Sequence, residues 1–152
     1  MLENELVSAY RLYIACLNDR DLDQLGNFVD DDVEYNGRRI GLAGYRAMLE
    51  GNYRDIPDLR FAVQMVIADT ASIGARLNFD CAPAGRFLGL EINGRRVSFS
   101  ENVFYEYADG RIRSVWSVVD KGAIEAQLQA PNSLDTSGDS RSRNAACNTG
   151  LL

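Results

Sequence analysis

Asp109 and Gly110 separate two long stretches of sequence in which apolar and polar residues alternate. Asp-Gly is a strong signal for a two-residue hairpin turn, because both central residues of that turn need a positive φ. The alternation predicts strands over residues 96–107 and 112–120, since neighbouring side chains in a strand point to opposite faces. This hairpin predicts an antiparallel sheet as the centre of the fold.

The other segments supply helices and further strands. In chain order, the patterns predict a helix over residues 3–18, a short helix that starts at an Asp21–Gln24 capping box, a strand that ends at Asn36-Gly37, a helix over residues 42–50, two strands between Leu59 and Cys81, a short edge strand in the connection that follows, and a helix around Ile124.

This element order predicts an α+β fold, with helices on one side of a curved, mostly antiparallel sheet. Residues 1–128 are expected to form one domain, with a deep pocket between the sheet and the helices. Residues 129–152 lack periodicity and are rich in Ser and Asn, a composition that predicts a flexible tail.

Charge and apolar patterning limit the partners. The formal net charge is −6, whereas nucleic acids and anionic membranes favour basic surfaces. The chain has no apolar run of transmembrane length, and its acidic N-terminal stretch lacks the layout of a signal peptide. The expected partner is a small molecule, and the expected location is the cytoplasm.

The composition also limits the chemistry. The chain has no histidine, and Lys121 is its single lysine. Histidine-based triads and histidine-containing metal sites are therefore excluded. The cysteines are odd in number and far apart, so no disulfide framework or zinc pattern is present. Acid–base chemistry must come from Asp, Glu, Tyr or Cys, and no metal or cofactor is expected.

A regular hairpin would place Asp120 opposite Phe99, on the concave face of the sheet together with Glu101, Tyr105 and Trp116. A carboxylate beside aromatic rings loses hydration, which raises its pKa and makes it a stronger base. We therefore expect Asp120 to act as a general base on a carbon next to a carbonyl, with Glu101 nearby. The enolate formed would need hydrogen-bond donors, and the candidates are Tyr105, Tyr35, Asn36 and Trp116.

Structural roles compete with these functional ones. Asp120 directly precedes a predicted helix and could be its N-cap. Glu101 could lie on the outer face or pair with an arginine, and Trp116 and Tyr105 could simply pack in the core. Arg76 and Asn78 share one strand face, which is either the pocket or the solvent side.

Four stretches resemble the SnoaL-like polyketide (ester) cyclases of the nuclear transport factor two-like superfamily: "GLAGYRAML", "IPDLRF", "AGRFLGLEINGRRVSF" and "ADGRIRSVWSVVDKGAIEAQL". The resemblance covers roughly residues 3–128. It implies a cone-shaped α+β barrel, a homodimer, and a pocket closed by the N-terminal helices. It also implies an aldol-type ring closure without metal or organic cofactor, with Asp120 matching the family's base. Many relatives carry a histidine where this chain has Pro83, which cannot transfer a proton.

The expected function is a cofactor-independent cyclase or isomerase that acts on a hydrophobic, polyketide-like carbonyl compound. Its expected catalytic residues are Asp120 and Glu101, and its expected substrate contacts are Trp116, Tyr105, Phe99, Tyr35, Asn36, Arg76, Asn78 and Tyr13.

Two alternatives remain open. One is a non-catalytic, dimeric ligand-binding module. The other is a limonene-type epoxide hydrolase built on Asp120, Arg76, Tyr35 and Asn36, with Asn78 where the second Asp would stand.

The dimer is expected to form through the outer face of the sheet, on which Val115, Val119, Leu77 and Phe79 are predicted to lie.

Overall fold

The central hairpin forms in the computed structural model of the chain, which describes residues 2–129. β7 (Val97–Ala108) and β8 (Arg111–Val119) are joined by Asp109 and Gly110, whose φ angles are 53° and 82°. Two successive positive φ angles are those of the turn that Asp-Gly favours. The predicted tail over 129–152 lies outside the described residues, except for Gln129.

Six strands form one sheet in the order β2-β1-β8-β7-β4-β3. β1 runs parallel to β8, and the other neighbouring strands are antiparallel. The strands besides β7 and β8 are β1 (Val29–Tyr35), β2 (Arg38–Arg39), β3 (Ala62–Ala68), β4 (Ser72–Cys81) and the separate short pair β5 (Arg86–Phe87) and β6 (Leu90–Glu91).

The helices are α1 (Glu3–Asp19), α2 (Gly41–Asp55), α3 (Lys121–Gln129) and a 3-10 helix, η1 (Leu22–Asn27). α2 extends five residues beyond the predicted C-terminal end, because its apolar face continues until the chain approaches Pro57. The predicted capping box at Asp21 is wrong: its side chain makes no capping hydrogen bond, and its backbone carbonyl accepts the N–H of Gln24. No helix within residues 2–129 is long and apolar enough to cross a membrane.

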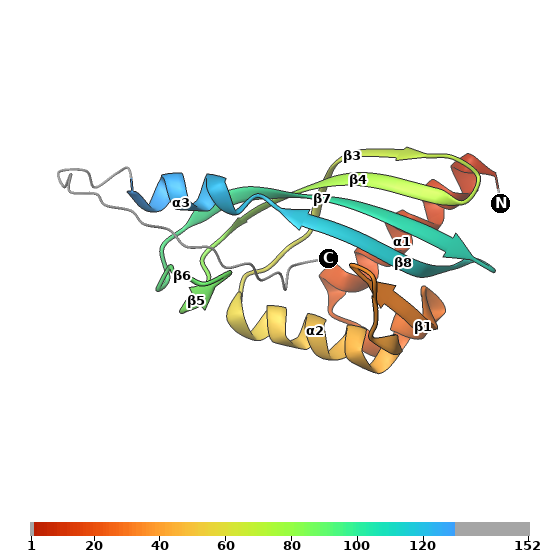
Figure 1. Ribbon diagram of the computed structural model, residues 1–152, viewed down its shortest axis with the longest axis horizontal. Coiled ribbons are helices and arrows are strands. Elements are labelled where there is room, and N and C mark those ends of the chain that lie inside the picture. Colours follow the sequence, from red (N-terminus) through yellow and green to blue (C-terminus); the bar gives the residue numbers. More distant parts are fainter. Residues whose placement is uncertain (1, 130–152) are drawn as a thin grey trace.

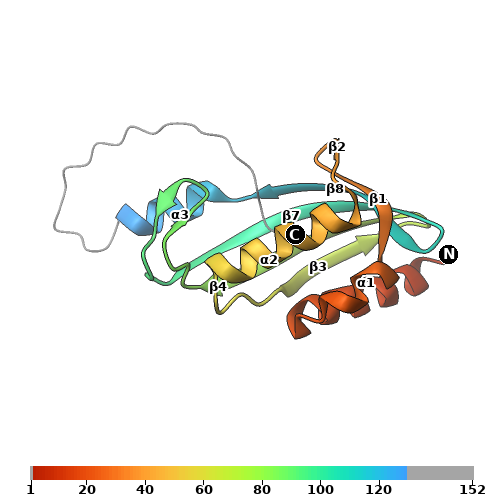
Figure 2. The same ribbon diagram turned by 90° about the horizontal axis from the view of Figure 1, so that it is seen from below.

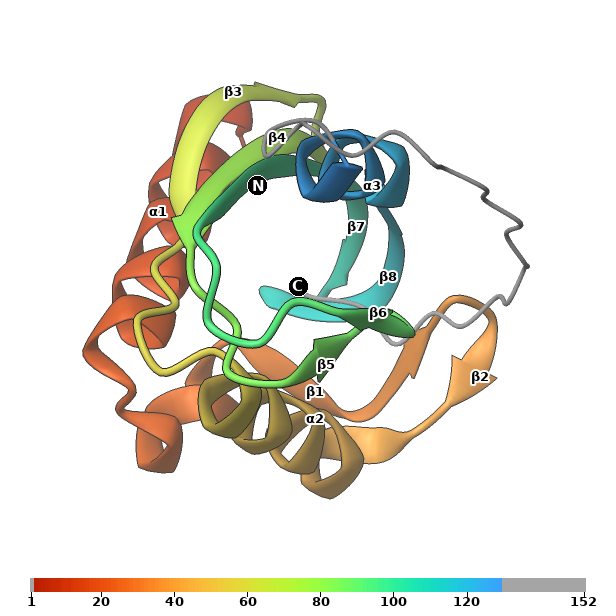
Figure 3. The same cartoon turned by 90° about the vertical axis from the view of Figure 1, so that its left-hand side faces the viewer.

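α1 and α2 cover the concave side of the sheet. Figure 1 shows the long strands above α2, and Figure 2, from below, shows α2 lying across them with α1 at its side. Seen along the long axis, the sheet curls into an incomplete barrel (Figure 3). Side chains from α1, α2 and the sheet, such as Leu17, Leu49 and Leu77, fill the space between these layers and are fully buried. The predicted α+β fold, with helices packed on a curved, mostly antiparallel sheet, is confirmed.

A one-residue bulge changes the register of the central hairpin. Tyr107 pairs with Ile112, but the next pair is Glu106 with Ser114, so Arg113 has no partner on β7. A bulge of this kind moves every later side chain of its strand to the opposite face relative to the partner strand. The predicted register is therefore wrong from Ser114 onward. Arg113 lies 4.0 Å from Asp30 of β1, an ion pair at the bulged position.

Candidate functional site

Glu101 is a carboxyl group in the middle of the apolar core. It lies on the inner face of β7 and is completely shielded from solvent. Among the described residues it is the one charged side chain that is fully buried. Burying such a group costs free energy unless hydrogen bonds replace the lost water. The alternative that Glu101 lies on the outer face of the sheet is wrong.

Ser117 is the hydrogen-bond partner of this carboxyl group. Its hydroxyl donates to Oε2 of Glu101, and it faces inward because the bulge shifts the register of β8. The phenol of Tyr35, at the end of β1, shares a hydrogen bond with Ser117. Oε1 of Glu101 is buried and has no hydrogen-bond partner within the described part of the chain. A buried, unpartnered oxygen marks a position where a bound molecule can complete the hydrogen bonding.

Phenol groups from α1, α2 and β7 itself surround the same region. Tyr10 of α1 donates to the hydroxyl of Tyr105 on β7 across 3.2 Å, and the ring centroids are 4.9 Å apart. The hydroxyls of Tyr13 on α1 and Tyr45 on α2 are 2.7 Å apart. All four side chains are fully buried. The interior therefore contains several hydrogen-bond donors beside Glu101 and is not a purely apolar core.

Burial sets the protonation of these groups. Desolvation raises the pKa of Glu101 well above its ordinary value of 4.5, and the hydrogen bond from Ser117 offsets part of that rise. Burial also raises the pKa values of Tyr10 and Tyr105, whose phenols stay protonated. Near neutral pH, neutral phenols therefore stand beside a carboxyl group that holds its proton more tightly than one in water.

Phenylalanine rings continue the interior beyond Glu101, toward the end of the sheet where β5 and β6 lie. The ring centroids are 5.5 Å apart for Phe61 and Phe79, 5.1 Å for Phe79 and Phe99, and 5.7 Å for Phe87 and Phe99. Packed aromatic rings offer favourable contacts to another flat, apolar ring system.

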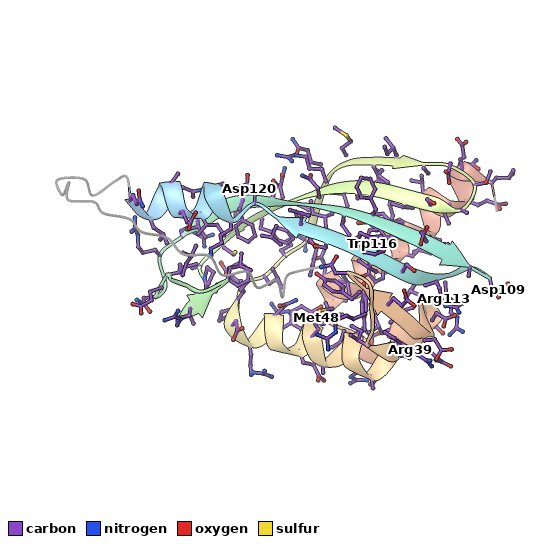
Figure 4. All side chains as sticks on the ribbon, in the orientation of Figure 1. Arg39, Met48, Asp109, Arg113, Trp116 and Asp120 are labelled. Atoms are coloured by element: carbon purple, nitrogen blue, oxygen red, sulfur yellow. The ribbon has the colours of Figure 1, made fainter. Side chains whose placement is uncertain are left out.

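Part of β8 has no neighbouring strand on the β1 side within the described residues. β1 ends at Tyr35, opposite Val115, and no other described strand pairs with β8 on that side. Ser117 and Val119 point inward beyond this level, and both are only partly buried. Figure 4 shows Met48 on α2 beneath this part of the sheet, and Met48 is also partly buried. These inward-facing but partly exposed residues mark the side on which the interior around Glu101 is least covered.

The ligand types that a metal site needs do not gather within residues 2–129. No three His, Cys, Asp or Glu side chains in that range could together hold a metal ion. Lys121, the single lysine, is the first residue of α3 and lies outside the Glu101 region. The chemistry available at this site is therefore that of a carboxyl group, a serine hydroxyl and phenols.

Asp120 lies outside the interior. It follows β8 at the opposite end of the strand from Asp109 (Figure 4), and it is exposed. Its Oδ1 accepts the N–H of Ala123 at 3.1 Å, as an N-cap of α3 does. The predicted position on the concave face beside Glu101 is wrong, because the bulge removes the pairing with Phe99. The alternative interpretation, a helix cap, is confirmed, and the expected general base loses its structural basis.

Trp116 and Asn36 are also placed differently from the prediction. Trp116 pairs with Phe104 on the outer face and is 47% exposed. Asn36 is exposed, and its Oδ1 accepts the backbone N–H of Ser117 at 2.8 Å. Neither side chain can donate to an enolate inside the sheet. The other predicted contacts on the inner side do lie there, namely Tyr105, Phe99, Tyr35 and Tyr13.

Arg76 and Asn78 lie on the solvent side of β4. They line a groove of about 560 Å³ on the outer face of the sheet, together with Asp120. The guanidinium of Arg76 donates to Gln64 at 2.8 Å and to Asn102 at 3.0 Å. Because Tyr35 faces the interior instead, the residue set expected for a limonene-type epoxide hydrolase is not brought together.

The sequence-based prediction omits three residues of the cluster. Tyr10 precedes Tyr13 by three positions in the buried stripe of α1, and Tyr45 precedes the buried Leu49 by four in α2. Helical spacing could therefore have placed both beside the sheet. Ser117 has no such signal, because its inward orientation depends on the bulge.

Comparison with known proteins identifies the family. The family model described as SnoaL-like polyketide cyclase matches residues 7–128. Among curated proteins, none matches this chain. A SnoaL-like polyketide cyclase from Agrobacterium tumefaciens is 52% identical, with a TM-score of 0.80 over 81% of this chain and 97% of that one.

Two more distant structures share the fold. AclR from Streptomyces galilaeus, described as a putative hydroxylase, is 21% identical with a TM-score of 0.69, over 83% of this chain and 96% of that one. IdmH from Streptomyces antibioticus, a putative polyketide cyclase, is 20% identical with a TM-score of 0.68, over 82% and 96%. The family model and the 52% identical structure both span most of the described domain. The chain belongs to the SnoaL-like polyketide cyclase family.

Proposed function

We propose that the chain is a cofactor-independent cyclase or isomerase that acts on a hydrophobic carbonyl compound, with Glu101 as its acid–base group. The observation that carries this proposal is the buried carboxyl group of Glu101, of which one oxygen is bonded to Ser117 and the other is unpartnered. Membership of the cyclase family supports the reaction type. The stacked phenylalanine rings favour a flat, polyketide-like substrate.

The proposed reaction moves one proton and needs no oxidant. Ionised Glu101 removes a proton from a carbon next to a carbonyl, and the electron pair of the broken C–H bond forms the C=C bond of an enolate. In a cyclisation, the enolate carbon attacks a second carbonyl carbon of the same molecule. The alkoxide formed there takes the proton back from Glu101. In an isomerisation, the proton returns to a different carbon.

The surroundings of Glu101 favour both halves of this cycle. A raised pKa makes the ionised carboxylate a stronger base, although a smaller fraction of it is ionised at neutral pH. Neutral phenols can donate hydrogen bonds to the enolate oxygen in a site with little water. The phenol of Tyr35 shares a hydrogen bond with Ser117, whose hydroxyl contacts Glu101, so Tyr35 is the proposed donor.

The test is exchange of carbon-bound hydrogen in deuterium oxide, with α-tetralone as a flat aromatic ketone. The wild-type chain should accelerate exchange next to the carbonyl. Glu101→Gln should lose this acceleration by about 10²–10⁴-fold, as expected for a positioned proton-transfer group. Asp120→Asn should keep it, since Asn still caps α3.

Two results would contradict the proposal. Loss of exchange in Asp120→Asn with retention in Glu101→Gln would return the role of base to Asp120. Tight binding of α-tetralone by the wild-type chain without any exchange would favour the alternative, a non-catalytic binding module.

We further propose that the protein is a homodimer through the outer face of its sheet. The registers align Ile67, Gly74, Phe104 and Trp116 in one row across four strands. Ile67 and Phe104 are 62% and 60% exposed, and Val118 in the adjacent row is 69% exposed. A contiguous apolar patch of this kind is unusual on a monomer.

This face carries different residues from those predicted. Val115, Val119, Leu77 and Phe79 point inward, because the bulge and the actual pairing of β4 with β7 place them on the concave side. Val118→Asp should give a monomer by analytical ultracentrifugation at micromolar concentration. A wild-type chain that sediments as a monomer would contradict the proposal.

A further inference from the structure

The side chain of Asn36 takes the place of a missing stretch of sheet. β1 ends at Tyr35, and the chain turns away at Asn36 and Gly37, whose φ angles are 49° and 86°. The backbone of β1 therefore cannot reach Ser117 on β8. The amide of Asn36 does so instead: Oδ1 accepts the N–H of Ser117 at 2.8 Å, and Nδ2 donates to its carbonyl oxygen at 3.5 Å.

These two contacts hold the backbone of Ser117 from one side. The N–H and C=O of one strand residue point in the same direction, so the groups that face Asn36 cannot also pair with Val103 on β7. Asn36 is itself fixed, because its own N–H donates to the carbonyl oxygen of Val115 at 2.8 Å. The N–H and C=O of Ser117, on the side away from β7, are thus held by one asparagine side chain.

Trp116 covers the same turn from the outer face. A Cβ atom added to Gly37 would lie 3.5 Å from Cη2 of the indole, so the ring sits directly against the turn. Apolar cover lowers the local dielectric and strengthens the hydrogen bonds beneath it. Trp116 therefore supports the turn that carries Asn36.

We propose that Asn36 is a positioning residue of the candidate site: by holding the backbone of Ser117, it places the Ser117 hydroxyl on Oε2 of Glu101. The catalytic meaning of this arrangement rests on the proposed function. The positioning itself does not, and it can be measured without a substrate.

The titratable groups that face Glu101 come from four elements and are phenols. They are Tyr10 on α1, Tyr35 on β1, Tyr45 on α2 and Tyr105 on β7. Burial raises the pKa of each, so they remain neutral while a carboxyl group titrates. The hydroxyl of Ser117 donates a hydrogen bond to Glu101 and stabilises its ionised form. Displacing its hydroxyl should therefore raise the pKa of Glu101 further.

The experiment is a titration of Glu101 by carbon-13 NMR of its side-chain carboxyl, in the full chain without ligand. Asn36→Gly removes the amide, while glycine still adopts the positive φ of the turn. The pKa of Glu101 should rise by about 0.5–1 unit, the equivalent of one ordinary hydrogen bond. Ser117→Ala should give a similar rise, and the double variant should add nothing to it, since both changes remove one interaction.

Asn93→Gly is the matched control. Asn93 and Gly94 form a second Asn-Gly turn with φ angles of 50° and 86°, and Asn93 is exposed. This variant makes the same backbone change and should leave the titration of Glu101 unchanged. An unchanged pKa in Asn36→Gly, or additive shifts in the double variant, would overturn the inference. Coupling between Asn36 and Ser117 without hydrogen exchange in α-tetralone would refute the proposed function and leave the positioning intact.

Discussion

Replacing Glu101 by glutamine should stabilise the protein at neutral pH, by an amount that grows with pH. Glutamine has nearly the shape of a protonated glutamic acid, can still accept the hydrogen bond from Ser117, and never ionises. The carboxyl group of Glu101 is fully buried, and its pKa is raised well above 4.5. The wild-type chain must either keep that proton or bury a charge, whereas the variant does neither.

The sign and size follow from proton linkage. Between the ordinary pKa of about 4.5 and the raised pKa of the folded state, the folded chain holds a proton that the unfolded chain has released. The free energy of unfolding of the wild type therefore falls with rising pH in this window, by about 1.4 kcal/mol per pH unit from this group. Below this window the protonated Glu101 makes its full contribution to the free energy of unfolding. Above the folded-state pKa of Glu101 this contribution to stability is completely lost.

The assay is urea denaturation of both chains from about pH 4 to about pH 8, followed by circular dichroism. The difference in unfolding free energy between Glu101→Gln and wild type should rise through this range and level off where folded Glu101 ionises. Glu106→Gln is the matched control, because Glu106 is exposed on the outer face of the same strand. A difference that is flat with pH, or a wild type that gains stability over Glu101→Gln as pH rises, would refute the reasoning.

Other positions give simpler tests. Asp120→Ala should lower the unfolding free energy by about 1 kcal/mol and Asp120→Asn by much less, as urea denaturation would show; equal losses would argue against the cap. Burial raises the pKa of the Cys81 thiol to about 12, so iodoacetamide at about pH 8 should alkylate it far more slowly in the folded chain than in urea. Comparable rates by peptide mass spectrometry would contradict this. Gly37→Ala should cost about 1–2 kcal/mol, because its φ of 86° disfavours an L side chain; unchanged thermal stability would speak against the strain.

The sequence predicts those features that depend on short-range signals. The Asp109-Gly110 turn, the alternating strands and the buried stripe of α1 are each specified by neighbouring residues, and all are present. The alternation of β7 places Glu101 on the same face as Tyr105, and the structure shows that this face is the inner one. The positions of Asp120 and Trp116 depend on the register between two strands, which a single unpaired residue changes, and the sequence around Arg113 carries no signal for that bulge.

The same bulge determines which side chains of β8 lie on each face of the sheet. Without it, Trp116 and Val118 would point at the helices, and an indole would fill the space beside Glu101. With it, β8 presents Ser117 to the interior, where a small hydroxyl bonds the carboxyl group and leaves room next to it. Trp116 moves outward, where it covers Gly37 and joins the exposed apolar row with Phe104. One extra residue at Arg113 thus creates the polar centre inside the sheet and the apolar patch outside it, so a change in hairpin register would alter both the proposed site and the proposed dimer.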